Sequence, residues 1–384
     1  MSPLAKILII TGIALFSPAR ISFAQDGGER GIRVGLVAGA QSVKISAEWK
    51  YSLCDVSLCA TTTIEPHNDY LVKAKGAAIE FDGRAYSSPI RLVAESGLER
   101  IRVNGKRYRG TILITAGKGG VTVVDDLGIE EYLYGILPTE ANPAWSPESL
   151  KAQAVVSRTY ALRNLKRHDR DGFDICTQTH CQVYGGLECE DERSNRAVDD
   201  TKGEVLIFKG ELAQALFHAS CGGYTENPNN VWNWESATPK YLAGRSDKYC
   251  SNSPHNVWKN RIAAGTIQSK LKQAGYSVGI ITKIKISGYS RSGRAKFLKI
   301  VHSGGTILIP ASKFRMAVDT WLIKSTLFKD IARRGNAFEF SGRGWGHGVG
   351  LCQWGAKGMA EKGKDYKEIL EYFYPGTDVE QTHE

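Results

Sequence analysis

The sequence predicts an α+β fold in which a β-rich N-terminal lobe precedes a mixed α/β region. Residues 31–125 alternate apolar and polar side chains at strand spacing, and Gly119 lies in a glycine-rich turn between two such segments, as in a β-hairpin. Helical patterns follow from about residue 126, and strand-like segments then return at 280–286, 297–302 and 306–309. Because strands and helices occur in separate runs, the pattern favours α+β over alternating α/β architecture.

Three helices are expected at the start of the mixed region. Residues 128–137 place their apolar side chains on one helical stripe. Ser146 and Pro147 form a helix start with a capping hydroxyl and a proline in the first turn, and this helix should run to about Leu165. One of its faces consists mostly of small residues, which permits close packing: Leu150, Ala154, Ser157 and Ala161. A short acidic helix is expected near 190–200.

The first residues predict export. The chain has 384 residues and a formal charge of +10, which would suit nucleic acid, an anionic membrane surface or an anionic polymer. Residues 1–24 combine Lys6, a short apolar run over 7–16, and the small residues Ser22 and Ala24, as in a cleaved secretory signal peptide. The apolar run is too short to span a bilayer. We therefore expect an exported protein with no transmembrane anchor after cleavage and no nucleic-acid partner, whose charge falls to +8 once Lys6 and Arg20 are removed.

Glu140 is a candidate general acid. It lies between two expected helices, from which its carboxyl group can project into a cleft, and Trp145 follows five residues later. Apolar surroundings raise the pKa of a carboxyl group, as a general acid working near neutral pH requires. The alternative is a solvated or helix-capping glutamate.

Glycine occupies every second position from Gly342 to Gly350. If this segment is extended, one face is bare and the other carries Arg343, Trp345 and His347. An arginine, a tryptophan and a histidine on one face suit an anionic sugar, and strand packing is the alternative. The glycine register does not fit a dinucleotide-binding fingerprint.

The eight cysteines leave two kinds of chemistry open. In an exported protein, oxidation to disulfides is the default, and the five-residue spacings of Cys54 with Cys59 and Cys176 with Cys181 would each close a small loop. Cys176, His180 and Cys181 also offer thiolate and imidazole ligands that suit zinc. The spacing alone does not decide between a disulfide and zinc, and it fixes no connectivity.

Taken together, several segments resemble the SpoIID/LytB family of sporulation and amidase-enhancer proteins. They are EEYLYGILPTE (130–140), LKAQAVVSRTY (150–160), CQVYGG (181–186), FHASCGGYTEN (217–227), GWGHGVGLCQWGAKG (344–358) and YFYPGT (372–377). The resemblance extends over about 105–378. With it, the expected domains are the signal peptide 1–24, a β-rich region 25–104, a SpoIID/LytB-like domain 105–378 and a C-terminal tail 379–384.

The resemblance implies a lytic transglycosylase that cleaves peptidoglycan glycan strands lacking stem peptides. Its catalytic acid would be Glu140, and Lys151 and Arg158 match positions tied to activity, where they would hold substrate carboxylates or orient Glu140. The family usually has Met and then Pro after this glutamate, whereas Ala141, Asn142 and Pro143 follow it here. Some members bind zinc through His and Cys, which raises zinc at Cys176, His180 and Cys181 to parity with a disulfide; no cofactor is required for the reaction itself.

The other branch of the family implies a different role. There the protein would bind glycan without cleaving it and would enhance a separate cell-wall amidase. The motif residues fit both roles, so the choice between enzyme and enhancer stays open at this stage.

Overall fold

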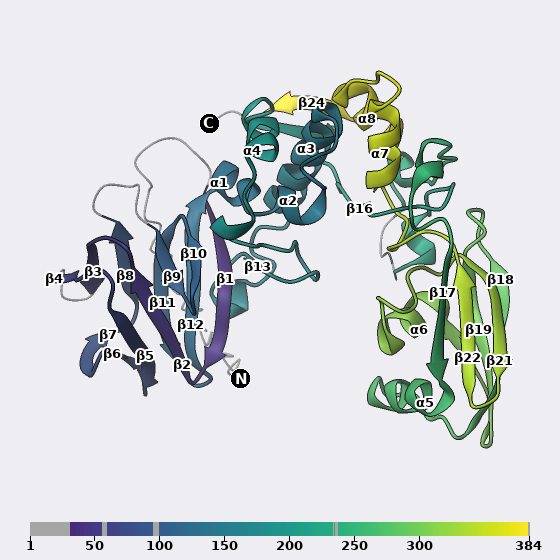
Figure 1. Cartoon of the computed structure of the whole chain (residues 1–384), viewed down its shortest axis with the longest axis horizontal. Helices are drawn as coiled ribbons and strands as arrows, with labels where there is room; N and C mark the ends of the chain where they lie inside the picture. The colour runs from purple at the N-terminus through teal and green to yellow at the C-terminus, as the bar shows by residue number, and fades with distance from the viewer. Residues whose placement is uncertain (1–30, 56–59, 95–99, 233, 235–236, 383–384) are drawn as a thin grey trace, which may run out of the picture.

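The computed structural model describes residues 31–55, 60–94, 100–232, 234 and 237–382. The expected signal peptide 1–24 and Cys59 lie outside the described residues. The chain forms an arch, with a β-rich lobe at one end, a helical region at the top and a second lobe at the other end (Figure 1). The α+β class expected from the sequence is confirmed.

The N-terminal lobe is a sandwich of two sheets. One has the strand order β13-β1-β12-β11-β8-β3-β4 and the other the order β10-β9-β2-β5-β6-β7. The strands are β1 (Gly31–Ala40), β2 (Ser42–Ala47), β3 (Tyr51–Asp55), β4 (Ala60–Ile64), β5 (Asp69–Lys75), β6 (Ala78–Phe81), β7 (Arg84–Ser87), β8 (Ile90–Ala94), β9 (Ile101–Val103), β10 (Lys106–Tyr108), β11 (Thr111–Gly117), β12 (Gly120–Gly128) and β13 (Ile175–Cys176). Alternate residues of both sheets, among them Ile32, Ile45 and Ile112, are buried in one core, as the period-two pattern predicts.

This lobe continues past the boundary after residue 104 that the sequence suggested. The hairpin of β11 and β12 pairs Gly117 with Gly120, and β12 then pairs antiparallel with β1. Because β12 lies between β1 and β11 in this sheet, the continuous β-rich part of the lobe extends to Gly128.

The other helices of the helical region all pack against one largely buried helix, α3 (Pro147–Arg163). They are α1 (Ile129–Tyr134), α2 (Leu137–Glu140), α4 (Glu192–Asp199), α7 (Gln353–Ala360) and α8 (Tyr366–Phe373). The small-residue face of α3 is buried, as expected. Ser146 does precede the helix, but its hydroxyl makes no capping hydrogen bond; instead its carbonyl accepts the hydroxyl of Ser149.

Among the described residues, the helical region also contains five short strands. They are β14 (Glu204–Phe208), β15 (Glu211–Leu212), β16 (Phe217–His218), β23 (Leu351–Cys352) and β24 (Asp378–Gln381). β24 pairs with β14, so residues 379–381 of the expected C-terminal tail are part of a sheet. β16 pairs with β23 in parallel, which places the motif at 217–227 beside the motif at 344–358.

The second lobe has its own core and was not separated by the sequence patterns. It holds β17 (Trp258–Ala263), α5 (Ala264–Gln273), β18 (Ile281–Tyr289), β19 (Ala295–His302), β20 (Gly305–Pro310), α6 (Ala311–Val318), β21 (Phe328–Arg334) and β22 (Ala337–Gly342). The helices α5 and α6 pack against these strands. The region expected as one domain over 105–378 therefore contains two bodies.

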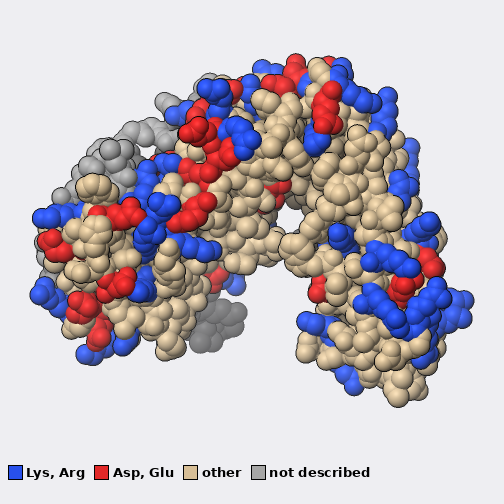
Figure 2. Space-filling view, in the orientation of Figure 1, with Lys and Arg blue, Asp and Glu red and all other residues tan. Residues whose placement is uncertain are grey.

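The two lobes leave an open hollow beneath the arch (Figure 2). In this view, charged side chains of both signs cover the outer surfaces of the lobes, and the middle of the arch beside the hollow is largely uncharged. Among the described helices, none has the length and apolar character that crossing a bilayer requires.

Candidate functional site

Glu140 is the last residue of α2, a short helix on the lower edge of the helical region, facing the hollow (Figure 1). Leu137 is fully buried and anchors the start of α2. The backbone N–H of Ala141 donates to the carbonyl of Leu137 at 2.9 Å, and Ala141 itself is extended and buried. The buried Leu137 and Ala141, joined by this hydrogen bond, thus fix the backbone on both sides of Glu140.

The Glu140 carboxyl group is half-buried and contacts neutral donors. Its Oε1 accepts the backbone N–H of Val183 at 3.4 Å, and the side chain of Gln353 makes a second hydrogen bond to it. Burial raises the pKa of Glu140 to about 7, although both hydrogen bonds favour the ionised form and lower it. A carboxyl group in this state can give or take a proton near neutral pH.

Two segments far apart in the sequence supply these donors. The loop carrying Val183 is held by Thr139, whose hydroxyl donates to the Val183 carbonyl at 2.6 Å, and by Tyr132, whose hydroxyl donates to the Gln182 side chain at 3.2 Å. Gln353 begins α7 and its amide donates to Gln153 on α3 at 3.4 Å. In the sequence, Gln353 stands out only as part of the motif at 344–358. Its contact with Glu140 depends on the tertiary structure, in which β23, directly before Gln353, pairs with β16.

The structure brings the expected ligands Cys176, His180 and Cys181 together and adds His168. One ligand atom from each of these four residues lies within 4.8 Å of the others. The Cys181 Sγ lies 3.6 Å from His168 Nε2 and 3.7 Å from His180 Nδ1. The four-residue set has two imidazoles and two thiols, a combination that suits tetrahedral zinc.

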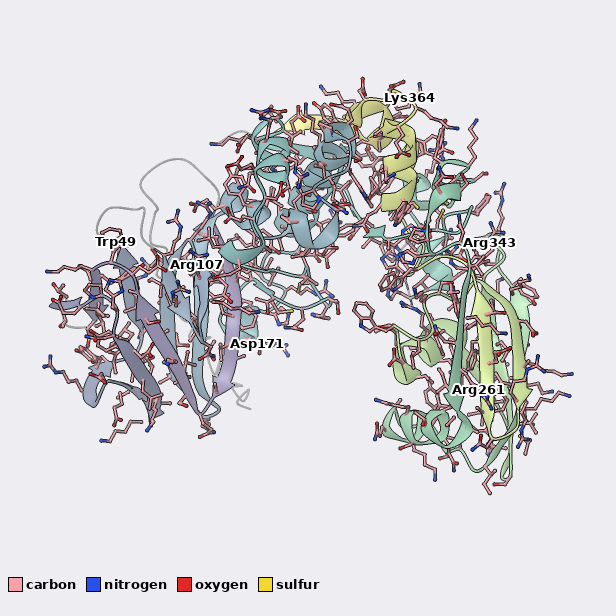
Figure 3. All side chains as sticks on the ribbon, viewed as in Figure 1. Trp49, Arg107, Asp171, Arg261, Arg343 and Lys364 are labelled. Carbon is pink, nitrogen blue, oxygen red and sulfur yellow. The ribbon has the colours of Figure 1, made fainter. Side chains whose placement is uncertain are left out.

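The surroundings of this His-Cys cluster also fit a metal. The Nδ1 of His168 contacts the Asp171 carboxylate at 2.8 Å, the type of contact that orients a metal-binding histidine through its other nitrogen. Asp171 lies on the side of the N-terminal lobe that faces the hollow (Figure 3). Burial and the nearby Arg167 and His168 lower the pKa of His180, which favours the neutral, ligating form. All seven described cysteines are thiols; for Cys54, the expected partner Cys59 lies outside the described residues.

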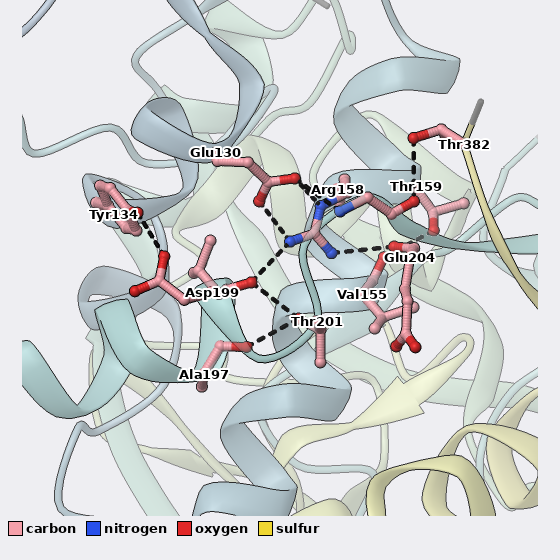
Figure 4. A network of polar contacts seen from close by, with 12 residues as sticks. Glu130, Tyr134, Val155, Arg158, Thr159, Ala197, Asp199, Thr201, Glu204 and Thr382 are labelled. Carbon is pink, nitrogen blue, oxygen red and sulfur yellow. Dashed lines mark hydrogen bonds and ion pairs between the residues drawn. The ribbon is translucent and has the colours of Figure 1, made fainter. Parts of the chain in front are cut away.

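The expectation that Arg158 contacts substrate is not supported. Its side chain is fully buried, and its guanidinium forms a bidentate ion pair with Glu130, at 2.8 Å and 2.5 Å (Figure 4). It also donates to the carbonyls of Glu204 and Val198. Arg158 therefore fastens α3 to α1 and β14, and its position in a motif reflects this internal contact.

Lys151 is also engaged in ion pairs. Its ammonium group lies 3.0 Å from Asp200 and 3.5 Å from Glu148. The hydrogen bond to Asp200 raises the pKa of Lys151, so this side chain carries its charge. In the part of the chain that the structure describes, the contacts of Glu140 are to Val183 and Gln353 rather than to Lys151 or Arg158.

The glycine-alternating segment is not a flat strand, which corrects the sequence interpretation. β22 ends at Gly342, and the glycines after it have positive φ: Gly344 at 76°, Gly346 at 107°, Gly348 at 89° and Gly350 at 73°. The chain therefore coils, and Arg343, Trp345 and His347 do not share one extended face. Close approach explains the glycines, since a Cβ on Gly350 would lie 1.8 Å from the Leu216 carbonyl oxygen.

Two of these side chains instead make separate contacts with other aromatic rings. Trp345 stacks edge-on with Trp321 at 5.1 Å, and His347 lies 4.9 Å from the ring of Trp232. Trp321 is 69% exposed and Trp232 is 39% exposed, so each places a large ring in solvent. Arg343 is exposed. The sequence singled out Trp345 and His347, but it did not indicate that Trp232 and Trp321 join them.

Two family models match separate parts of the chain. A family model described as Stage II sporulation protein matches residues 117–208, which include Glu140 and the His-Cys cluster, and a model described as Domain of unknown function (DUF8618) matches residues 225–350, which include the second lobe.

Three relatives cover most of the chain. An uncharacterized protein of Brachyspira hyodysenteriae is 39% identical over 72% of this chain and 73% of its own length. The Amidase enhancer of Bacillus subtilis is 30% identical over 87% of this chain, which spans only 52% of that relative. Stage II sporulation protein D of Bacillus subtilis is 27% identical over 84% of this chain and 94% of its own length. With the family-model match and these relatives, the chain belongs to the SpoIID/LytB family.

Proposed function

We propose that this protein is exported and acts on cell-wall peptidoglycan as a lytic transglycosylase, with Glu140 as its single acid and base. The observation that carries the proposal is the half-buried Glu140 carboxyl group, whose pKa is raised by burial to about 7. The relationship to Stage II sporulation protein D and to Amidase enhancer supports a role at the cell wall.

The reaction needs only one carboxyl group. Protonated Glu140 gives its proton to the glycosidic oxygen as the bond from muramic acid breaks. The same carboxylate then takes the proton from the 6-hydroxyl of that muramic acid, whose oxygen attacks the anomeric carbon and closes a 1,6-anhydro ring. Val183 N–H and the Gln353 side chain stabilise the carboxylate between the two steps.

The contacts of Glu140 agree with this scheme. Ordinary glycosidases use a second carboxylate as nucleophile or to activate water. The two groups that contact the Glu140 carboxyl in the described residues, an amide N–H and a glutamine, are not acidic. An intramolecular hydroxyl nucleophile removes the need for a second acid.

The glycan would lie in the hollow of the arch. Sugar rings stack on exposed aromatic side chains, and Trp232 and Trp321 offer such rings at the second lobe's junction with the helical region. Glycan strands without stem peptides keep the lactyl carboxylates of muramic acid, which are complementary to the positive net charge of the chain.

We also propose that His168, Cys176, His180 and Cys181 hold a zinc ion with a structural role. The ion would hold together both ends of the loop that leads to Val183, two residues after Cys181. It would thereby position the Val183 N–H toward Glu140 and would take no direct part in bond cleavage.

Mass spectrometry of the products tests the transglycosylase proposal. Purified protein is incubated with glycan strands from which an amidase has removed the stem peptides. New ends that lack one water relative to hydrolytic ends are the expected result, because the 6-hydroxyl replaces water as nucleophile. Hydrolytic ends alone would contradict the proposed mechanism.

The second candidate function is enhancement of a separate cell-wall amidase, and the 30% identity to Amidase enhancer supports it. In this case the same protein would bind glycan, would produce no new glycan ends and would increase release of stem peptides by an added amidase. Running both assays on one preparation separates the two functions.

Replacing Gln353 with leucine should shift the pH dependence of cleavage. The Gln353 hydrogen bond stabilises the ionised carboxylate, so its loss raises the pKa of Glu140 above about 7. Because the first step needs protonated Glu140, the alkaline limb of the pH–rate profile should move to higher pH. An unchanged limb, measured beside a control with Gln273→Leu at an exposed position at the end of α5, would show that this hydrogen bond does not tune the acid.

A further inference from the structure

A second group of metal-binding side chains lies at the start of α7, where Cys352 directly precedes Gln353. Cys221, Asp247, Cys250 and Cys352 are all buried, and one ligand atom from each lies within 4.8 Å of the others. We call these four residues the Cys-Asp cluster. Figure 3 shows sulfur atoms gathered below α7, near the junction with the second lobe. The sequence patterns gave Cys250 and Cys352 no role beyond the general expectation of disulfides.

The four side chains come from three separate segments. Cys221 follows β16, Cys352 ends β23, and Asp247 and Cys250 belong to a loop with a short 3₁₀ helix (Tyr249–Asn252). The Cys221 Sγ lies 3.4 Å from the Cys250 Sγ and 3.1 Å from the Asp247 Oδ2. Tetrahedral zinc with thiolate ligands places sulfur atoms about 3.8 Å apart, so only a small adjustment is needed.

Backbone N–H groups point at two of the sulfur atoms. The Cys352 Sγ accepts from Cys221 N–H at 3.2 Å and from Gly355 N–H, in the first turn of α7, at 3.3 Å. The Cys221 Sγ accepts from Gly223 N–H at 3.3 Å. Such donors stabilise a thiolate, the form that binds metal, and they fix its orientation.

The Asp247 carboxylate is also oriented toward the sulfur atoms. Its Oδ1 accepts the backbone N–H of Tyr249 at 2.9 Å, and Oδ2 faces Cys221. Gly355 leaves room for this arrangement, since a Cβ there would lie 2.5 Å from Oδ2. The carboxylate is thus held in place to present its second oxygen to the cluster.

A buried positive charge accompanies these groups. The Arg294 side chain is 1% exposed and donates to the carbonyl of Cys221 at 2.7 Å. Its guanidinium interacts electrostatically with Cys221, Cys250 and Cys352, as well as with Glu226. Three thiolates and a carboxylate around a divalent cation carry a net negative charge, which an adjacent arginine compensates.

We infer that the Cys-Asp cluster binds a zinc ion through Cys221, Cys250, Cys352 and Asp247. Zinc accepts both cysteine thiolates and aspartate oxygens, and four buried protein ligands that leave no open position indicate a structural rather than a catalytic ion. The ion would connect three segments near the junction with the second lobe: the residues after β16, the end of β23 where α7 begins, and the loop 247–252. This inference is independent of the proposed transglycosylase activity.

A disulfide between Cys221 and Cys250 is the competing outcome. This disulfide would use two of the four groups and would leave the Cys352 thiol and the Asp247 carboxylate buried without a metal ion to bind. Metal ligation satisfies all four groups at once, which is why the arrangement favours zinc.

Zinc content of the purified full-length mature protein tests this inference. We expect two zinc ions per chain, one in the His-Cys cluster and one here, measured by inductively coupled plasma mass spectrometry. Cys250→Ala and Asp247→Asn should each bind one zinc fewer than the Cys189→Ala control, whose thiol lies outside both clusters. His168→Ala should keep the zinc of the Cys-Asp cluster.

X-ray absorption at the zinc edge provides a test that needs no substitution in the Cys-Asp cluster. In His168→Ala protein, the remaining zinc should show about three sulfur ligands and one oxygen. Equal zinc content in Cys250→Ala and Cys189→Ala would overturn the inference. So would a peptide pair linking Cys221 to Cys250 in a non-reducing digest of the wild-type protein.

Discussion

Glu140→Gln protein is expected to lose about 10²–10⁴-fold of its rate of anhydro-end formation on glycan strands without stem peptides. Glutamine has nearly the same shape and can keep the Val183 and Gln353 contacts in modified form, but it cannot transfer a proton to the glycosidic oxygen. The loss should appear in kcat, because the carboxyl group acts mainly in the transition state. Initial rates of product formation, followed by mass spectrometry, measure it.

Glu192→Gln is the matched control for this substitution. Glu192 is exposed in the first turn of α4, so its replacement should leave the rate unchanged. Thermal unfolding of both variants shows whether the fold is intact. Undiminished anhydro-end formation by folded Glu140→Gln protein would exclude Glu140 as the catalytic acid.

Arg158→Ala protein is expected to lose about 3–5 kcal/mol of its free energy of unfolding. The substitution leaves the Glu130 carboxylate buried without its partner and removes the donor to the carbonyls of Val198 and Glu204. Urea unfolding monitored by circular dichroism measures the change. Because a loss of this size leaves the variant only marginally stable, the unfolding curves are recorded at low temperature, where a folded baseline is present.

A double variant separates the structural role of Arg158 from a substrate contact. Arg158→Met combined with Glu130→Leu replaces the buried ion pair with apolar side chains and should recover much of the lost stability. If the double variant is stable and cleaves glycan, Arg158 acts only within the fold. A stable Arg158→Ala protein with weakened glycan binding would instead show that Arg158 contacts substrate.

Local sequence patterns predicted most of the secondary structure. The hairpin around Gly119 and the strands 280–286, 297–302 and 306–309 follow from spacing within a few residues, and β11, β12, β18, β19 and β20 confirm them. Helices α5 and α6 were not expected; in α5, for example, the buried Ile267 and Leu271 give only a weak helical stripe between loops. The stability of α5 depends on packing against the second lobe, which no local pattern contains.

Motif recognition predicted the family and indicated Glu140, but it could not separate functional from structural residues. Arg158 and Glu140 both lie in motifs, yet Arg158 is fully buried in an ion pair while Glu140 is half-buried at the end of α2. A motif records that a residue matters to a fold or a reaction, and only its surroundings in space distinguish the two. The same limit applies to Trp345 and His347, whose aromatic partners come from distant segments.

The sequence by itself determined the α+β class, the family, most strands and helices, and one candidate acid with part of one metal-binding set. The tertiary structure alone added His168 to that set, placed Gln353 beside Glu140, and assembled Cys221, Asp247, Cys250 and Cys352. The physical reason is range: turn geometry and side-chain periodicity act over a few residues. The contact of Gln353 with Glu140 and the Cys-Asp cluster arise instead where segments more than a hundred residues apart, such as β16 and β23, pack together, and the loop fold alone brings His168 back to Cys181.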